Sequence, residues 1–332
     1  SIQEGKSVTK HNEIKAGSSC NIAIVIPCYK VLDSISEVVH GVLDFADLIV
    51  VVDDHCPEKS GQYVEKMFLN DKVKVIYHDV NTGVGGAVLS GYQFAFDYGV
   101  DVIVKMDGDG QMDPLYLNDL VDPILNGTAD YTKGNRFFDV ESTAQMPLVR
   151  LIGNVGLSFF TKMSSGYWNI FDPTNGYTAI SASVARNLPF EKIQKGYFFE
   201  SDVLFRLNIL RAVVIDVSMP AKYGNEISNL NILNEFMKFL FLNLKNFGKR
   251  VVYSYFIRDF NYASIELLFG FFLSIFGVLF GLVSWVEASQ QEAIATAGTV
   301  MLASLPIILG TQLLLGFLNY DMRNIPITVL HK

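Results

Sequence analysis

The chain has 332 residues, 50% of them hydrophobic and 18% charged, and its mean hydropathy is +0.29. That length suits one or two domains with a sizeable core, and the apolar excess indicates membrane segments beside a soluble part. A formal net charge of -8 argues against a nucleic-acid partner. The three cysteines form no Cys-x-x-Cys pair, which argues against a disulfide framework and favours a reducing compartment.

Residues 1–19 are polar and lack the apolar core of a signal peptide, so a flexible N-terminus is expected there. From residue 20 to about 220, short apolar runs alternate with amphipathic segments. This alternation predicts an α/β domain with a mainly parallel sheet and helices on both faces. The strands are expected at 22–27, 48–52, 73–77, 101–106, 130–136 and 212–217. The helices are expected at 33–46, 58–70, 87–98, 114–126, 147–165 and 198–210.

An acidic, glycine-rich stretch, Asp107–Pro114, follows the fourth predicted strand. Asp107 and Asp109 are two residues apart, so in extended backbone both carboxylates point the same way. The intervening glycine and the one after Asp109 permit a sharp turn. With the amide oxygen of Gln111, the carboxylates make an all-oxygen set that suits Mg²⁺ or Mn²⁺, with substrate phosphates completing the shell. An ordinary acidic turn is the alternative.

Other polar and glycine residues also fall at predicted strand ends, where ligands of parallel α/β sheets bind. Carboxylates there can accept hydrogen bonds from a base or a ribose, glycine-rich turns can receive an anion, and arginines can contact phosphate groups. A helix cap or a surface charge is the alternative for each of these polar residues. The candidates are Asp53, Asp54, Gly83, Gly85, Arg136 and Arg150, with Asp172 and Glu200 as carboxylates that could face a sugar.

The last third of the chain changes character. Residues 230–247 have apolar side chains at helical spacing with lysines between them, which predicts an interfacial helix in a juxtamembrane segment, 221–262; a core-packing helix is the alternative. Two stretches within 263–319, about 263–286 and 293–318, are long enough to cross a bilayer core of ~30 Å.

Basic residues flank this pair of stretches, whereas the short acidic loop between them has none. The positive-inside rule therefore places the catalytic part and the tail, 320–332, in the cytoplasm. A buried soluble hairpin is the alternative. Glycines in both spans permit close helix contacts and make a homo-oligomer plausible.

Taken in chain order, these motifs resemble family 2 glycosyltransferases of the GT-A fold. The branch they resemble transfers sugars to polyprenyl phosphates, as dolichol-phosphate mannose synthase and the bacterial GtrB-type and ArnC-type enzymes do. The resemblance covers about residues 20–220, and the two apolar spans match the membrane-anchored members. The motifs are Ile26-Pro27-Cys28-Tyr29, Val52-Asp53-Asp54, Asn81-x-Gly-x-Gly-x-Ala87, Asp107–Pro114, Gly134-Asn-Arg136 and Asp172–Tyr177.

The resemblance implies a role for individual residues, with Asp53 on the nucleotide base. His55-Cys56 departs from the small Gly-Ser type of turn that many members have after the paired aspartates. The implied catalytic residues are Asp107, Asp109, Arg136 and Asp172. The implied donor-binding residues are Pro27, Tyr29, Asp53, Asp54, Gly83, Gly85, Asp107, Arg136 and Arg150. The implied ligands of Mg²⁺ or Mn²⁺ are Asp107, Asp109 and Gln111.

The implied reaction inverts the configuration of the sugar linkage. It transfers a single sugar unit, because the Gln-x-x-Arg-Trp motif of processive synthases is absent. A lipid monophosphate is already anionic and needs little help from a base. The greater requirement is therefore to stabilise the departing nucleoside diphosphate. The expected reaction transfers glucose from UDP-glucose to undecaprenyl phosphate at a bacterial inner membrane, for a cell-envelope polysaccharide. Another donor such as GDP-mannose or a UDP-amino sugar, a sugar-hydroxyl acceptor, and a non-enzymatic membrane scaffold are the alternatives.

Overall fold

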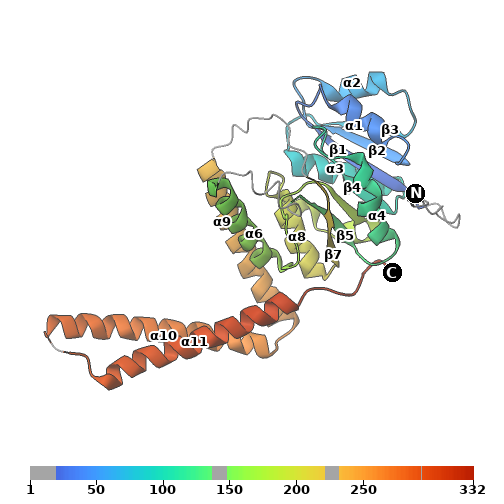
Figure 1. Cartoon of the computed structure of the whole chain (residues 1–332). Coiled ribbons are helices and arrows are strands. Elements are labelled where there is room, and N and C mark those ends of the chain that lie inside the picture. The colour runs from blue at the N-terminus through green and yellow to red at the C-terminus, as the bar shows by residue number, and fades with distance from the viewer. Residues whose placement is uncertain (1–19, 137–147, 221–231, 293) are drawn as a thin grey trace, which may run out of the picture.

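The computed structural model describes residues 20–136, 148–220, 232–292 and 294–332. The expected flexible N-terminus lies outside the described residues. Figure 1 shows an α/β domain, a pair of helices beside it and a helical hairpin that projects away from both.

A seven-stranded sheet in the order β3-β2-β1-β4-β6-β5-β7 forms the centre of the α/β domain. All strands run parallel except β6, which is antiparallel to its neighbours β4 and β5. The sheet is therefore mixed, and its short β6 is an element that the sequence did not reveal. The strands are β1 (Ile22–Cys28), β2 (Leu48–Asp53), β3 (Val73–Tyr77), β4 (Val102–Lys105), β5 (Tyr131–Asn135), β6 (Thr178–Ser181) and β7 (Val214–Ser218).

Helices cover both faces of the sheet, as the apolar strands predict. Ile24 and Ile26 of β1 pack with the layer of α1, α2 and α4, whereas Ala23 and Val25 pack with the layer of α3 and α8. The helices of the domain are α1 (Ile35–Val42), α2 (Ser60–Met67), α3 (Val84–Asp97), α4 (Leu117–Leu125), α7 (Ala182–Ala185) and α8 (Phe199–Leu210), with 3-10 turns η1 (Pro114–Tyr116) and η2 (Phe190–Lys192).

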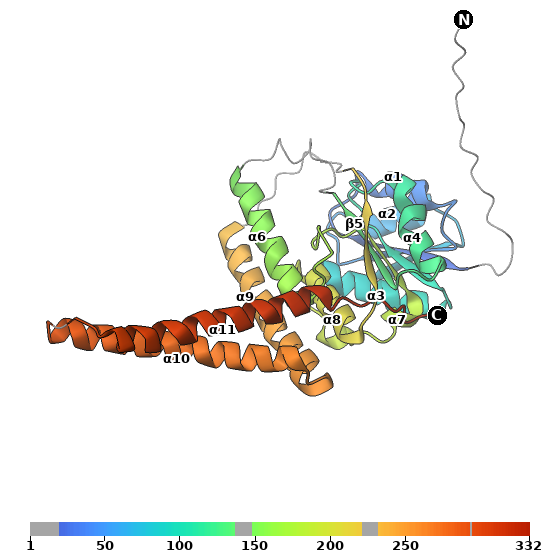
Figure 2. The same cartoon turned by 60° about the horizontal axis from the view of Figure 1, so that its bottom comes forward.

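Two further helices, α6 (Leu148–Ser165) and α9 (Ile232–Val252), lie side by side next to the domain (Figures 1 and 2). Helix α9 buries polar side chains and exposes apolar ones, the opposite of a core helix. Its polar Asn243 and Asn246 are buried, while its apolar Met237 and Phe241 are more than half exposed. Asn243 accepts a hydrogen bond from Ser164 of α6 at 2.6 Å. An exposed apolar face next to exposed lysines is the pattern of a helix that lies on a membrane.

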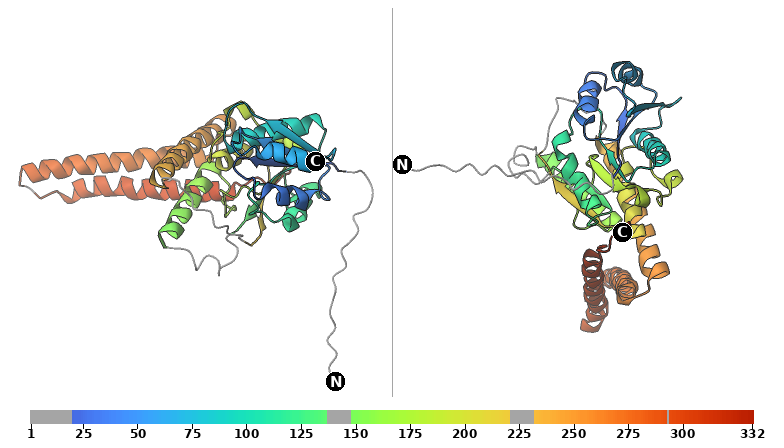
Figure 3. Two further views of the ribbon diagram at one scale, coloured as in Figure 1. Left: turned by 90° about the horizontal axis from the view of Figure 1, so that it is seen from above. Right: turned by 90° about the vertical axis from the view of Figure 1, so that its right-hand side faces the viewer.

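The chain then passes through a π-helical segment η3 (Tyr253–Arg258) into the hairpin of α10 (Tyr262–Gln290) and α11 (Ala297–Arg323). Both helices are long and apolar enough to cross a membrane, and only 11% of the most apolar window of each is buried. At 1.5 Å per residue each spans about 40 Å, more than the ~30 Å of a bilayer core. Figure 3 shows the two helices running together away from the domain.

Glycines line the contact between the two hairpin helices. A Cβ atom at Gly270 would lie 3.0 Å from the Gly310 carbonyl oxygen, and one at Gly277 would lie 2.7 Å from the Ala303 carbonyl oxygen. The expected close helix contacts are thus met within the hairpin. The homo-oligomer stays a prediction.

A buried carboxylate joins the hairpin to the rest of the protein. Asp321, near the end of α11, accepts hydrogen bonds from Arg250 of α9 at 2.6 and 2.9 Å. Tyr255 and Trp168 also donate to Asp321, at 2.6 and 2.9 Å. Because these side chains come from four separate segments, one carboxylate fixes α9, η3, α11 and the loop after α6 to one another.

The segment after α11 returns to the α/β domain. Arg211, just beyond α8, donates to the Asn324 carbonyl oxygen at 2.9 Å. Buried Asp130, just before β5, accepts from the Leu330 N–H at 2.9 Å, and its carboxylate lies 2.8 Å from the His331 imidazole. The segment 324–332 therefore runs as a strap along the domain, and its end lies beside the sheet (Figure 1).

Candidate functional site

The candidate site lies where parallel strands end and β6 begins. Because β6 runs against its neighbours, the turn before it reaches the same edge as the loops that follow β1, β2, β3, β4, β5 and β7. This places the stretches Asp107–Pro114 and Asp172–Tyr177 next to each other, although they are far apart in the sequence. Tyr177 donates a hydrogen bond to the Asp113 carbonyl oxygen at 3.0 Å, which ties the two stretches together.

Two hollows open along this edge, and they share two carboxylates. The larger hollow, of about 630 Å³, is lined by loops after β1, β2, β3 and β4 and by the segment before α8. The smaller hollow, of about 340 Å³, is lined by loops after β4, β5 and β7 and by the turn before β6. Asp107 and Asp109 line both hollows. Two ligands, one in each hollow, would therefore meet at these carboxylates.

Several of the expected donor-binding residues line the larger hollow. They are Pro27, Tyr29, Asp54 and Gly83, together with the shared Asp107. Sequence reasoning did not single out Gly196 and Tyr197, which close the hollow on the side of α8. These two residues lie before a helix and do not follow a strand, so the rule that ligands bind at strand ends does not point to them. The only signal in the sequence is an aromatic residue next to a glycine.

Asp53 and Asp54 organise the loops around the larger hollow. The buried Asp53 carboxylate accepts hydrogen bonds from the Cys56 N–H at 2.7 Å and the Gly61 N–H at 2.8 Å. Asp54 accepts from the N–H groups of Thr82 and Gly83, each at 2.8 Å. Burial alone would raise the pKa of Asp54, but these hydrogen bonds and that from His78 outweigh it and hold the pKa below its usual value.

The glycine-rich turn before α3 is held by its own backbone contacts. Gly85 N–H donates to the Lys195 carbonyl oxygen at 2.9 Å. Gly83 has a φ of +86°, and a Cβ there would lie 2.6 Å from the same oxygen. The N–H groups of both glycines have partners within the chain, so the close approach of the 194–199 segment is what requires glycine here.

Arg136 and Asp172 form a pair at the smaller hollow. Arg136 lines the hollow, and its Nε lies 2.8 Å from the Asp172 carboxylate, which is fully buried. A second contact joins Nη2 to the other carboxylate oxygen at 3.3 Å. Asp172 thus orients the Arg136 guanidinium, a geometry that suits recognition of a phosphate by the same side chain. Arg150 lies in the first turn of α6, and its side chain lies outside the described residues.

Buried charges lie beneath the site, and the sequence pattern gave no sign of them. Lys105 on β4 is fully buried, with its Nζ 2.8 Å from Asp107 Oδ1 and 3.0 Å from Glu200 Oε1. Burial lowers the pKa of Lys105, but the two carboxylates outweigh it and raise the pKa above its usual range. Lys133 on β5 is also buried and donates to the Asn175 carbonyl oxygen, and burial lowers its pKa to about 8.

The oxygen donors fit a divalent cation that takes part of its shell from a substrate. Asp107, Asp109 and Gln111 all line the smaller hollow, and Asp109 accepts the Gln111 N–H at 3.0 Å. In the parts of the chain that the structure describes, no group of three or more His, Cys, Asp or Glu side chains could hold a metal by itself. Two carboxylates and an amide suit Mg²⁺, which usually keeps water and phosphate oxygens as ligands.

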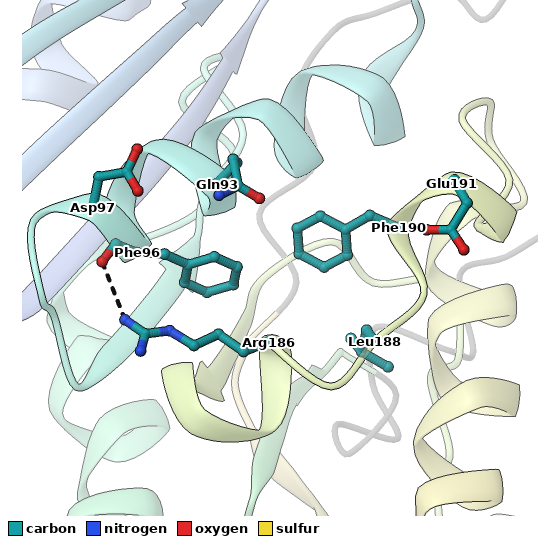
Figure 4. Close-up of a pocket in the computed structure, with 7 residues that line it drawn as sticks. All are labelled: Gln93, Phe96, Asp97, Arg186, Leu188, Phe190 and Glu191. Atoms are coloured by element: carbon teal, nitrogen blue, oxygen red, sulfur yellow. Dashed lines mark hydrogen bonds between the residues drawn. The ribbon is translucent and has the colours of Figure 1, made fainter.

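A third hollow, of about 560 Å³, lies at the other end of α3 (Figure 4). The rings of Phe96 and Phe190 stack there with centroids 5.8 Å apart, and Arg186 donates to the Phe96 carbonyl oxygen at 3.1 Å. None of the predicted site residues whose side chains the structure describes lines this hollow. The end of α3 that carries Gly83 faces the site, so this hollow belongs to the opposite edge of the sheet.

Two ligand hollows that meet at paired carboxylates, on the carboxyl edge of an α/β sheet, define the site of a group-transfer enzyme. The model of the family described as glycosyl transferase family 2 matches residues 23–188, which is half of the chain. The protein belongs to this family and is a glycosyltransferase. The expected α/β fold followed by apolar C-terminal helices is confirmed with it.

Named relatives lie in the branch that the motifs indicated. The UDP-N-acetylglucosamine–dolichyl-phosphate N-acetylglucosaminyltransferase of Methanococcus voltae is 30% identical over 55% of this chain and 78% of its own length. The undecaprenyl-phosphate mannosyltransferase of Micrococcus luteus is 28% identical over 59% and 81%. The polyprenol monophosphomannose synthase of Mycolicibacterium smegmatis is 29% identical over 55% and 70%. The resemblance to the polyprenyl-phosphate branch is thereby confirmed.

Among solved structures, that of S. aureus TarS 1-349 in complex with UDP-GlcNAc covers 88% of this chain and 92% of its own. Its TM-score is 0.46 at 13% identity, a similarity too low to inform the site.

Proposed function

We propose that this protein transfers one sugar from a nucleotide sugar to a polyprenyl phosphate at a membrane surface, with inversion and with Mg²⁺ or Mn²⁺ as cofactor. The observation that carries the proposal is the pair Asp107 and Asp109, which lines both hollows at their junction. The larger hollow would take the nucleotide and the smaller one the phosphate of the acceptor. The relatives named above act on dolichyl, undecaprenyl or other polyprenol phosphates, which favours a lipid acceptor.

The charges of the two hollows suit this division of labour. Arg136 and residues 174–177 line the smaller hollow, where an anionic acceptor phosphate would bind the guanidinium. Asp172 would keep that guanidinium turned toward the phosphate through the contact at 2.8 Å. The inverted burial of α9 and the apolar hairpin would hold the site close to the bilayer, from which the acceptor comes.

In the proposed mechanism the acceptor phosphate oxygen attacks the sugar carbon, and the bond to the nucleoside diphosphate breaks. The acceptor is anionic at neutral pH, so the residues of the site need to orient it more than to deprotonate it. Asp107, Asp109 and Gln111 would hold the cation, which supplies positive charge to the departing diphosphate. Tyr29 and Tyr197 would flank the nucleotide in the larger hollow and exclude water.

The proposal also includes the identity of the nucleotide-sugar donor. UDP-glucose is the expected donor, and the relatives named above transfer N-acetylglucosamine or mannose. A panel of labelled UDP-glucose, UDP-N-acetylglucosamine and GDP-mannose tests this. The purified full chain should make an organic-soluble labelled product only when polyprenyl phosphate is present. Transfer to a soluble oligosaccharide instead would favour a sugar-hydroxyl acceptor.

The role of the shared carboxylates is tested with Asp109→Asn. We expect transfer to fall about 100-fold or more, as when one strong electrostatic group is removed from an active site. Asp119→Asn makes the same charge change at an exposed position of α4 and is the matched control. The measurement is the initial rate of product formation over a titration of Mg²⁺ and Mn²⁺. Equal rates and equal metal dependence in the wild type and Asp109→Asn would refute the assignment.

A further inference from the structure

A buried lysine holds one of the shared carboxylates. Lys105 is the last residue of β4, two positions before Asp107, and its side chain is 1% exposed. Its Nζ lies 2.8 Å from Asp107 Oδ1 and 3.0 Å from Glu200 Oε1. An ammonium group without solvent has three donors to place, and here two of them are directed at carboxylates. The position of Asp107 thus depends on a group that neither hollow exposes.

The turn before β6 closes over this contact. A Cβ atom at Gly176 would collide with Lys105 Nζ and would lie 2.7 Å from Asp107 Oδ2. Only glycine lets the turn lie directly on the two side chains. The ammonium group is therefore confined from above by Gly176 and at its sides by its carboxylate partners, so Asp107 cannot change rotamer without breaking an ion pair in a low-dielectric site.

Glu200 connects the same lysine to the wall of the larger hollow. It lies in the first turn of α8, three residues beyond Tyr197, which lines that hollow. The segment just before α8 also packs on the glycine-rich turn, where the Lys195 carbonyl oxygen accepts the Gly85 N–H at 2.9 Å. Through Lys105, strand β4, which precedes Asp107, and helix α8, which follows Tyr197, are fixed to each other.

From this geometry we infer that Lys105 is a positioning residue for the transfer reaction: it holds Oδ1 of Asp107 and leaves Oδ2 to the ligands of the two hollows. The inference rests on the proposed function for its effect on turnover. A purely structural role makes a different prediction. If Lys105 served only to neutralise buried Glu200, removing both charges together would restore the enzyme.

The test compares Lys105→Met, Glu200→Gln and the double variant in the full-length protein. Lys105→Met leaves Asp107 and Glu200 without their cation, so both the thermal midpoint and turnover are expected to fall. In the double variant only Asp107 lacks its partner, so the midpoint should recover toward that of Glu200→Gln. Turnover should stay about 100-fold below the wild type, because a misplaced reacting group costs about that much. The donor KM should change far less than kcat.

A second readout does not depend on the reaction. Amide hydrogen exchange of the peptide covering residues 106–116 should be faster in Lys105→Met and in the double variant than in Glu200→Gln. Lys74→Met, which removes a lysine from β3 at the far end of the sheet, is the control and should leave exchange in this peptide as slow as in the wild type.

These readouts separate the two ideas. If the wild type transfers no sugar to any lipid acceptor, the proposed function fails, and hydrogen exchange still decides whether Lys105 positions Asp107. If the double variant turns over as fast as Glu200→Gln and its 106–116 peptide exchanges as slowly, Lys105 only neutralises Glu200 and the inference is overturned.

Discussion

Asp216, on β7 three residues before Met219 of the smaller hollow, is an ionisable side chain with an unusual environment. Its Oδ2 accepts hydrogen bonds from the Phe171 N–H at 2.7 Å and the Asn135 amide at 3.2 Å. Its Oδ1 is buried without a hydrogen-bond partner among the described residues. Burial raises the pKa of Asp216 from 3.8 to about 6, although the Phe171 N–H and Lys133 oppose the shift. Folding therefore favours the neutral form of this carboxyl, which stays protonated to a higher pH in the folded protein than in the unfolded chain.

This preference predicts a loss of stability with rising pH. Between pH 3.8 and about 6 the folded state keeps a proton on Asp216 that the unfolded state has released. The contribution of Asp216 to the free energy of unfolding is thus fully present below pH 3.8 and is lost as the pH rises through 6. A pKa shift of this size corresponds to about 3 kcal/mol. Asp216→Asn should remove this part of the pH dependence, measured as the thermal midpoint at pH 4.5 and 7.5. Asp119→Asn, which is exposed, is the control; the same pH slope in wild type and Asp216→Asn would contradict the expectation.

The residues of the site differ in how far the sequence revealed them. Asp107 and Asp109 could be predicted because a glycine-rich acidic turn after an apolar run is a local pattern. Lys105 lies inside such a run, and no local rule says that a strand lysine will pair with a carboxylate on α8. The contact of Arg136 with Asp172 joins residues 36 positions apart, so only the fold brings them together.

Most elements could be predicted from periodicity, and the exception explains the shape of the site. Strands β1, β2 and β3 are apolar runs between helices, and their observed bounds agree with the predicted ones to within a residue or two. β6 has only four residues and is preceded by a turn, so it has too few positions to show a period. Because β6 runs antiparallel to its neighbours, its first residue and not its last lies at the edge that carries the site. The rule that ligands bind at the carboxyl ends of parallel strands does not predict this.

Helix α9 shows why periodicity alone could not choose between a core helix and an interfacial one. Both have an apolar stripe, and they differ in which face the protein buries. The structure buries Asn243, Asn246 and Arg250, and it leaves Met237, Phe241 and Leu244 exposed beside lysines. The polar face is satisfied within the protein, for example by Asn246, which donates to Asp202 at 2.8 Å. This burial pattern supports the interfacial prediction.

The interfacial prediction is tested with Phe241→Glu. Phe241 is 66% exposed on α9, and burying such a ring in lipid contributes about 1.5–3 kcal/mol. We expect the apparent KM for polyprenyl phosphate in liposomes to rise roughly 10-fold, a change of about 1.4 kcal/mol. UDP binding, measured by calorimetry, should not change, because none of the described α9 side chains lines the larger hollow. Phe241→Leu is the control, and an unaltered acceptor KM in Phe241→Glu would argue against membrane contact by α9.

The hairpin and the α/β domain are held together by contacts at several places. Buried Arg250 pairs with Asp321 at 2.6 Å, and losing one partner of such a buried pair costs about 3–5 kcal/mol. Arg211 and Asp130 add contacts along the strap that follows α11. These contacts restrict how the domain can turn on the hairpin. They orient the edge that carries Asp107 relative to the apolar helices that would be in the membrane.

The strap also makes a prediction about membrane topology. Because Leu330 and His331 bind Asp130 of the α/β domain, we expect residue 332 to lie on the same side of the membrane as the site, and the loop after α10 to lie on the other. In a Cys20→Ser background, a membrane-impermeant maleimide should label Gln290→Cys in intact cells and Lys332→Cys only after the membrane is opened. The positive-inside rule gives the same orientation from the basic residues beside the hairpin. Labelling of both positions in intact cells, or of Lys332→Cys alone, would show that the two helices do not form a membrane hairpin with the site in the cytoplasm.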